Sequence, residues 1–262
     1  MTMKTILKVQ GLKKFFGSKK ILDNINFSLD AGECLGIVGR SGCGKSTLVK
    51  IISRLIPCDG GKIIFCDDDI TNLTGDDLRN IYKNMQMIFQ MPEDSFNPRK
   101  TLGWSISEPM KNFGLKDVRE RAKNLLIEVG LNENYFSRYP HEVSGGECQR
   151  AAIARAISLE PKILICDEAT SALDVTVQKK IIELLKKFCT EKNISCLFVT
   201  HDIALLPKIA DRVIVLHKGK IVEEGTPTKI IESPHSPFTK DLFASDFFAR
   251  KKLVDCKMNS DR

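Results

Sequence analysis

The sequence predicts an α/β fold with a mainly parallel sheet, an antiparallel β subdomain near the N-terminus and an inserted α-helical subdomain. Three observations support this fold class. Strand-like and helical segments alternate over most of the 262 residues. A buried, strand-like run from Glu33, ECLGIVG, leads directly into a glycine-rich turn and then a helix. From about Asn97 to Leu159 the pattern is almost entirely helical.

The first strands precede the glycine-rich turn. ILKVQGL from Ile6 and INFSL from Ile25 have the composition of strands that form an antiparallel sheet ahead of the main one. The helix after the turn has apolar residues at helical spacing, namely Leu48, Ile51, Ile52 and Leu55. Two further strands are predicted, KIIFCD from Lys62 and MQMIFQ from Met85.

The helical stretch has one apolar stripe, formed by Val118, Ala122, Leu125, Leu126 and Val129. Beyond it come the strand ILIC from Ile163 and a helix whose apolar stripe contains Val177, Ile181, Leu184, Leu185 and Phe188. CLFVT from Cys196 and RVIVLHKG from Arg212 are predicted strands, and KIVEEG from Lys220 closes a hairpin with the latter. We therefore divide the chain into a core (1–96 and 160–232, antiparallel subdomain included), a helical subdomain (97–159) and a C-terminal extension (233–262). The last dozen residues, polar and basic, are expected to fray.

Composition narrows the class of protein. The net charge of +7 fits either a solvated surface or a surface that meets nucleotide, nucleic acid or an anionic membrane. The nine cysteines include no Cys-x-x-Cys pair, and several lie in apolar runs, which fits small hydrophobic residues in a reducing cytoplasm. The N-terminus does not resemble a signal peptide, and no apolar run approaches the roughly 20 residues that span a bilayer. A membrane role would therefore require a partner.

A phosphate-binding loop begins at Gly39. The run GRSGCGKS matches G-x-x-x-x-G-K-[ST] between a strand and a helix, which is the required context. The glycines let backbone N–H groups turn toward phosphate oxygens, and the helix adds its positive end. Lys45 reaches the outer phosphates, Ser46 supplies a hydroxyl for Mg²⁺, and Thr47 is placed near an inner phosphate. The chain is thus predicted to have a P-loop NTPase core.

A second part of this site is the strand ILIC, which ends in Asp167 and Glu168. Asp167 is placed to hold Mg²⁺ through water, and Glu168 to polarise the attacking water. A strand that ends in two acids is weak as a signal by itself and becomes strong downstream of a phosphate loop.

A second anion-binding nest follows in VSGGE, where a serine and two glycines precede an alanine-rich helix. The helical subdomain separates this nest from the first, so one ATP cannot use both nests of one chain. A second subunit facing head to tail would bring its nest to this chain's γ-phosphate.

At this point the sequence resembles the ABC ATPase family over nearly the whole chain, because all of the family's motifs occur in the family's order. The resemblance implies ATP and Mg²⁺ as cofactors. It implies an adenine-stacking aromatic at Phe16, a phosphate loop, a glutamine that contacts Mg²⁺ at Gln90, a signature motif, and a D-loop that ends at Asp174. It also implies a metal-binding Asp167, a catalytic Glu168 and a switch histidine at His201. The loop comprises Gly39, Arg40, Ser41, Gly42, Cys43, Gly44, Lys45, Ser46 and Thr47. The signature comprises Ser144, Gly145, Gly146 and Glu147.

Two positions depart from the family's usual residues. The signature reads VSGGE instead of LSGGQ, and the adenine platform is Phe16 instead of the commoner tyrosine. The serine and glycines make the phosphate contacts, so function is expected to survive, although Glu147 would weaken ATP capture by its charge. Stacking on adenine needs only the ring face.

The segment FQMPEDSFNPR and the element from Ser233 to Leu242 resemble those of the peptide and nickel importers. Some members of that group bind iron–sulfur near the C-terminus, but only Cys256 lies there, so no cluster is predicted. GRSGCGKSTL favours the nickel branch slightly. The implied partners are a second ABC ATPase subunit, distinct or identical, two permeases and an external substrate-binding protein. The implied location is peripheral, on the cytoplasmic face of the cell membrane.

Three other functions were weighed. DNA-repair ABC ATPases place long coiled coils between loop and signature, whereas only residues 48–143 intervene here, without sustained heptads. Ribosome-associated relatives usually carry two such domains, and a nucleotide kinase would lack VSGGE and SALD. An importer ATPase with no nucleic-acid partner is the preferred prediction, and a non-transport ABC ATPase acting on RNA or DNA stays the alternative.

Overall fold

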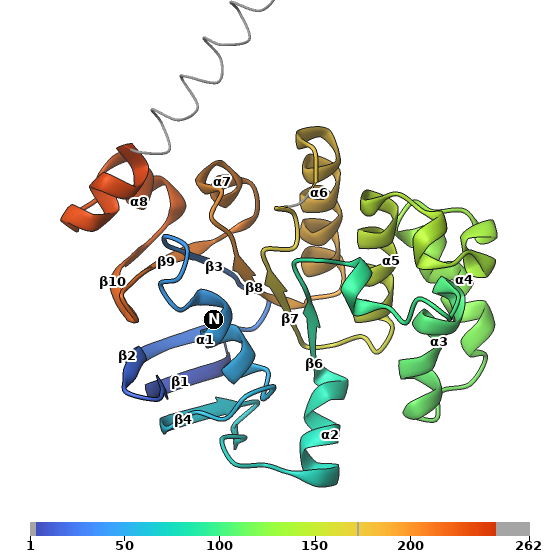
Figure 1. Cartoon of the computed structure of the whole chain (residues 1–262), viewed down its shortest axis with the longest axis horizontal. Helices are drawn as coiled ribbons and strands as arrows, with labels where there is room; N and C mark the ends of the chain where they lie inside the picture. Colours follow the sequence, from blue (N-terminus) through green and yellow to red (C-terminus); the bar gives the residue numbers. More distant parts are fainter. Residues whose placement is uncertain (1–3, 172, 245–262) are drawn as a thin grey trace, which may run out of the picture.

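A computed structural model describes residues 4–171 and 173–244 (Figure 1). Its larger sheet has six strands in the order β10-β9-β3-β8-β7-β6. All neighbouring pairs are parallel except the β9–β10 hairpin, which is antiparallel, so the predicted parallel sheet and closing hairpin are both confirmed. The strands are β3 (Cys34–Val38), β6 (Met85–Ile88), β7 (Ile163–Asp167), β8 (Ser195–Val199), β9 (Arg212–His217) and β10 (Lys220–Gly225).

Every residue of β3, β7 and β8 is buried, as expected for parallel strands covered on both faces. Their side chains alternate between two apolar clusters. Leu35, Ile165 and Leu197 face one cluster, while Leu164 and Phe198 face the other. The sheet therefore separates two cores.

A second sheet lies beside the first and has the order β2-β1-β4-β5, antiparallel throughout. Its strands are β1 (Thr5–Phe16), β2 (Lys19–Asp30), β4 (Gly60–Phe65) and β5 (Asp68–Asp69). This confirms an antiparallel β region and adds that β4, from beyond the phosphate loop, pairs with β1. The helix α1 (Lys45–Ile52) contributes buried side chains to the core between the two sheets.

The other face of the parallel sheet is covered by α6 (Val175–Glu191) and α7 (Leu206–Ile209). Asp174 begins α6 by accepting hydrogen bonds from the N–H groups of Thr176 and Val177, both at 3.0 Å. The remaining helices of the core are α2 (Gly75–Asn84), α8 (Pro227–Glu232) and the 3₁₀ turn η4 (Ile203–Leu205).

The helical stretch forms the right-hand end of the molecule in Figure 1. It contains α3 (Leu102–Asn112), α4 (Val118–Glu128), α5 (Gly145–Ile157) and the 3₁₀ turns η2 (Glu133–Ser137) and η3 (Pro140–Glu142), while the 3₁₀ turn η1 (Glu93–Ser95) comes just before the predicted boundary at Asn97. From the predicted stripe of α4, Ala122, Leu126 and Val129 are buried. The alanine-rich face of α5 packs in one apolar cluster with residues of α3, α4 and α6.

No helix in residues 4–171 and 173–244 has the length and apolar character needed to cross a membrane. The predicted fraying of the last dozen residues, and Cys256, fall outside the described residues.

Candidate functional site

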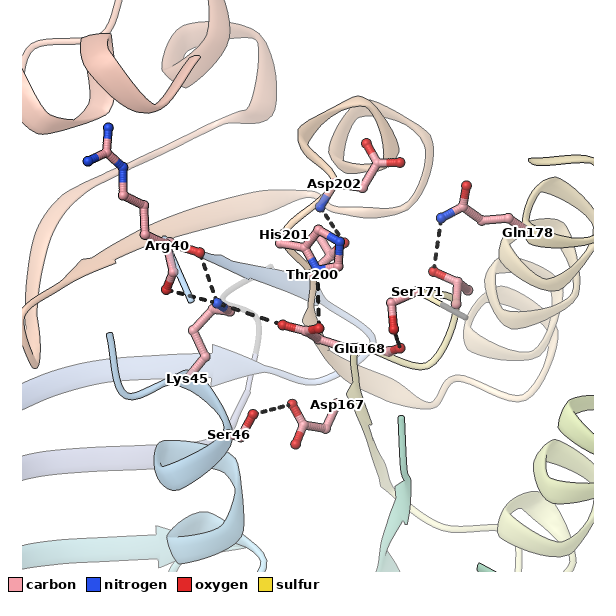
Figure 2. A network of polar contacts seen from close by, with 12 residues as sticks. Arg40, Lys45, Ser46, Asp167, Glu168, Ser171, Gln178, Thr200, His201 and Asp202 are labelled. Atoms are coloured by element: carbon pink, nitrogen blue, oxygen red, sulfur yellow. Dashed lines mark hydrogen bonds and ion pairs between the residues drawn. The ribbon is translucent and has the colours of Figure 1, made fainter. Parts of the chain in front are cut away.

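The phosphate loop occupies residues 39–44, between the buried end of β3 and the start of α1. At Gly39 the backbone runs so close to β9 that a Cβ would lie 2.2 Å from the carbonyl oxygen of Leu216, so only glycine fits. The Lys45 side chain is 4% exposed, and its Nζ donates to the carbonyl oxygens of Gly39, at 2.8 Å, and Arg40, at 3.3 Å (Figure 2). The ammonium group is therefore held inside the loop.

The first carboxylate, Asp167, is the last residue of β7 and is 6% exposed. Ser46, the second residue of α1, donates from its hydroxyl to Asp167 Oδ1 at 3.1 Å. Burial raises the pKa of Asp167, and the hydrogen bond from Ser46 opposes that rise. A buried carboxylate beside a hydroxyl is an arrangement that a cation would stabilise.

The second carboxylate, Glu168, has a left-handed backbone with φ of 50°, a conformation that costs energy outside glycine. Its N–H donates to the carbonyl of Val199 at 3.0 Å, which fixes this turn against β8. Its Oε2 lies 3.1 Å from Nδ1 of His201, and its Oε1 lies 3.8 Å from Nζ of Lys45 (Figure 2). Glu168 thus stands between the ammonium group and the imidazole.

The loop and Glu168 share a cavity of about 310 Å³. Its lining contains eight predicted site residues, which are Ser41, Gly42, Gly44, Lys45, Ser46, Thr47, Gln90 and Glu168. Gly39, Arg40, Asp167 and His201 join them through the contacts given above. Cys43 is buried in the loop, where burial raises the pKa of its thiol. The structure therefore gathers residues from four separate sequence segments at one place.

Three other predicted groups lie outside that lining. Phe16 ends β1 with 54% of its surface exposed. Asp174 caps α6. The signature residues begin α5, where the Ser144 hydroxyl accepts from the N–H of Glu147 at 3.4 Å.

Glu147 has a local role that the sequence did not predict. Its Oε2 accepts from the N–H of Ser144 at 2.9 Å and its Oε1 accepts from the hydroxyl of Tyr135. The bond from Tyr135, followed by that from the Ser144 N–H, lowers the pKa of Glu147. The carboxylate is therefore charged and is engaged on two sides within its own chain.

Sequence reasoning missed other residues that shape the site. Ile21 lines the cavity, but an apolar strand residue gives no sequence signal for such a role. Ser171 donates to the carbonyl of Glu168 at 3.0 Å, and Thr200 accepts from the N–H of Asp202 at 2.9 Å. Ser171 is the first residue of the predicted D-loop and Thr200 directly precedes the predicted switch histidine, which is the signal that would have assigned them to the site.

The donor set fits Mg²⁺. Within the described residues no group of three or more His, Cys, Asp or Glu side chains could hold a metal ion. Ser46, Asp167 and the nearby Gln90 instead offer a few oxygen donors beside an anion-binding loop. Mg²⁺ commonly binds one or two protein carboxylates and completes its shell with water and phosphate oxygens.

Comparison with known families assigns the loop and the two carboxylates to one family. Residues 22–171 match the model of the family described as "ABC transporter". The chain belongs to the ABC transporter family. It is 41% identical over 259 residues to the oligopeptide transport ATP-binding protein OppF of Salmonella typhimurium, covering 92% of this chain and 78% of that protein.

Two other relatives of this ABC protein are also named as ATP-binding proteins of transport or import systems. The oligopeptide transport ATP-binding protein AppF of Bacillus subtilis is 42% identical over 263 residues, with 95% of this chain and 80% of AppF covered. The glutathione import ATP-binding protein GsiA of Salmonella paratyphi A is 44% identical over 227 residues, which are 86% of this chain and 36% of GsiA.

Among solved structures, the ATP-binding cassette MJ0796 in a dimeric, post-hydrolysis state bound to ADP and Pi has a TM-score of 0.77 and 30% identity. The match covers 85% of this chain and 99% of that one. The fold is that of an ABC ATPase cassette, and the chain is the ATP-hydrolysing subunit of an ABC importer of the peptide importer subfamily.

Proposed function

We propose that this ABC ATPase powers the uptake of peptides through separate permease subunits, using ATP that it binds jointly with a second ATPase subunit. The observation that supports it most is that Lys45 and Glu168 line one cavity beside the phosphate loop, with His201 in contact with Glu168. The oligopeptide and glutathione relatives support the cargo class. The nickel alternative has no comparable support among the relatives named above.

The loop from Gly39 to Thr47 would bind the triphosphate through its N–H groups and the positive end of α1, with Phe16 stacking on adenine. Lys45 would turn its ammonium from the loop's carbonyl groups to the outer phosphates. Ser46, Gln90 and Asp167 would hold Mg²⁺, which neutralises phosphate charge when bound.

Glu168 would orient and polarise the attacking water, because its carboxylate faces the cavity and is fixed by the turn after β7. His201 would steady the γ-phosphate from the other side of that carboxylate, since its ring lies 3.1 Å away.

The signature nest, Ser144 to Glu147, would act on the nucleotide of the second subunit. It begins a helix of 13 residues, whose N-terminal end attracts anions, and it lies outside the lining of this chain's own cavity. Asp174 would communicate across the same interface. The second subunit would be a distinct paralogue or another copy of this chain.

The wider assembly is part of the proposal. Two permeases and an external substrate-binding protein would complete the importer, with this chain peripheral on the cytoplasmic face of the membrane. Residues 97–159 would move as a unit against the core of 1–96 and 160–232, and 233–262 would be an extension of that core.

Replacing Glu168 by Gln tests the assignment of the water-polarising residue. We expect ATP hydrolysis by the assembled importer to fall at least about 100-fold, because general-base catalysis contributes factors of that size, while Mg-ATP binding persists. Steady-state phosphate release and equilibrium binding of labelled ATP measure the two effects.

Glu183→Gln is the matched control, since Glu183 lies on the surface of α6 with 64% of its side chain exposed. It should hydrolyse ATP at the parent rate. Parent-level hydrolysis by Glu168→Gln would refute the role of Glu168.

A further inference from the structure

The C-terminal segment of residues 233–242 contacts the phosphate loop through one aromatic ring. Phe238 stacks on His217, with ring centroids 3.7 Å apart and an angle of 24° between the planes. The guanidinium carbon of Arg40 lies 5.6 Å from the centroid of Phe238. The ring therefore joins the end of β9 to the second residue of the loop.

This segment is firmly docked. The carboxylate of Glu223 on β10 accepts from the N–H groups of His235, at 2.7 Å, and Ser236, at 3.0 Å. Thr239 has no exposed surface, and Leu242 packs into an apolar cluster with Ile230. The position of Phe238 is thus set by the segment's own attachments, independently of Arg40.

Arg40 connects this contact to the inside of the loop. Its side chain points away from Lys45 and Glu168, as Figure 2 shows, while its carbonyl oxygen accepts from Nζ of Lys45 at 3.3 Å. The same carbonyl accepts from the N–H of Cys43 at 3.3 Å. Restricting the side chain of Arg40 therefore also restricts the carbonyl that shapes the phosphate loop.

The β9–β10 hairpin supports the loop at a second point. Gly219 lies in the turn between β9 and β10, and its N–H donates to the carbonyl of Cys43 at 3.1 Å. Burial, with Lys218 and Arg40, lowers the pKa of His217, so at neutral pH the ring is uncharged and does not repel the guanidinium. The hairpin and the C-terminal segment thus form one support on the outer side of the loop.

We propose that Phe238 is a positioning residue for the phosphate loop. Its contact with Arg40 restricts the conformation of the loop, and this restriction raises the affinity for ATP. The proposal rests on the proposed function, because it assumes that this loop binds the triphosphate. It assigns to residues 233–242 a role in nucleotide binding, with no direct contact to the nucleotide.

A double-mutant cycle on the full chain tests it, with Phe238→Leu, Arg40→Leu and both together. Equilibrium binding of a fluorescent Mg-ATP analogue supplies the affinities. Phe238→Leu should weaken binding about two- to fivefold, the size that one exposed cation–π contact supports. In the Arg40→Leu background the same change should have no effect, because the contact is already lost. In the assembled importer KM should rise while kcat stays constant.

Two further variants separate bracing from simple packing. Phe238→Tyr keeps the ring face and should restore parent affinity, whereas Lys240→Ala, on the exposed side of the same segment, should change nothing. If the effects of the two substitutions on Mg-ATP affinity were additive, or if Phe238→Leu left that affinity unchanged, the role of Phe238 would be refuted and the proposed function would stand. A parent chain that did not bind Mg-ATP would overturn the proposed function and the inference with it.

Discussion

The sequence predicts the chemical role of single side chains in this protein, but it does not predict which residues they contact. Spacing alone placed Lys45 and Ser46 in a phosphate loop and two acids at the end of a strand. The family resemblance predicted Glu147 beside the bound phosphate of a partner. Within its own chain the carboxylate of Glu147 also accepts hydrogen bonds from the hydroxyl of Tyr135 and from the N–H of Ser144, which the sequence did not predict. A contact between residues 135 and 147 depends on how η2 packs against α5, which no local pattern contains.

At this scale we predict that Glu147→Gln, which introduces the family's usual residue, destabilises the protein by about 0.5–1.5 kcal/mol. The carboxylate accepts a charge-assisted hydrogen bond on each oxygen, whereas an amide keeps one acceptor oxygen for the N–H of Ser144 and its NH₂ donates to the hydroxyl of Tyr135, so both bonds lose the charged acceptor. Urea unfolding at neutral pH measures the difference.

The pH dependence gives a second measure of the same prediction. Because the folded pKa of Glu147 is lowered, the stabilisation is fully present above the ordinary value of 4.5 and is lost as pH falls through the lowered pKa. The gap between parent and Glu147→Gln should therefore close in acid. Glu142→Gln is the control, since Glu142 uses only one oxygen, toward the N–H of Tyr139 at 2.8 Å. An equal loss in both variants would argue against a special role for the two-sided bonding.

At the scale of elements, periodicity predicted most of the strands and the helical character of the middle stretch. It did not predict how the short turns lie on the helices. Gly103, in the first turn of α3, is in contact with η2: a Cβ there would lie 2.4 Å from the ring of Phe136 and 2.6 Å from its carbonyl oxygen. The sequence shows a glycine near a helix start, which is a common and uninformative position.

We expect Gly103→Ala to cost about 1–3 kcal/mol, the usual range for forcing extra volume into a packed site. The ring and the backbone of Phe136 must both move, and the hydrogen bond from the N–H of Leu102 to the carbonyl of Arg138, at 2.8 Å, resists that shift. Thermal unfolding of the purified chain is the measurement.

Gly60→Ala in β4 is the matched substitution, because its Cβ would meet the side chain of Lys13 at 3.7 Å, an ordinary contact. It should change stability much less than Gly103→Ala. Equal effects at both sites would show that the close approach to Phe136 is not the cause.

On the scale of the whole molecule, one side chain joins the two sheets. Arg212, the first residue of β9, donates from Nε to Glu33 at 2.7 Å and from Nη2 to the carbonyl of Ser28 on β2 at 2.6 Å. It also forms an ion pair with Glu224 on β10. These bonds, led by the one to Glu33, raise the pKa of Arg212. Partners more than 170 residues apart in the chain have no sequence signature, so this connection was not predictable.

Arg212→Met should destabilise the chain by about 2–4 kcal/mol, because it leaves the mostly buried carboxylate of Glu33, 11% exposed, without its cation. Lys179→Met removes an exposed pair with Glu183 and should cost no more than about 0.5 kcal/mol. Chemical denaturation of both variants compares them, and a loss below 1 kcal/mol for Arg212→Met would contradict the proposed link between the sheets.

The hydrogen bonds between the phosphate loop and Lys45 affect which ligands the loop can bind. The ammonium group of Lys45 has two backbone oxygen acceptors of its own, so a ligand of the loop must replace them with oxygen atoms that attract the charge more strongly. An uncharged ligand, such as a sugar or a nucleoside, offers no negative oxygen in place of these carbonyl groups. A group with several negative oxygens, such as a triphosphate, makes this exchange of acceptors favourable. The loop therefore selects for such groups at the binding step, before hydrolysis.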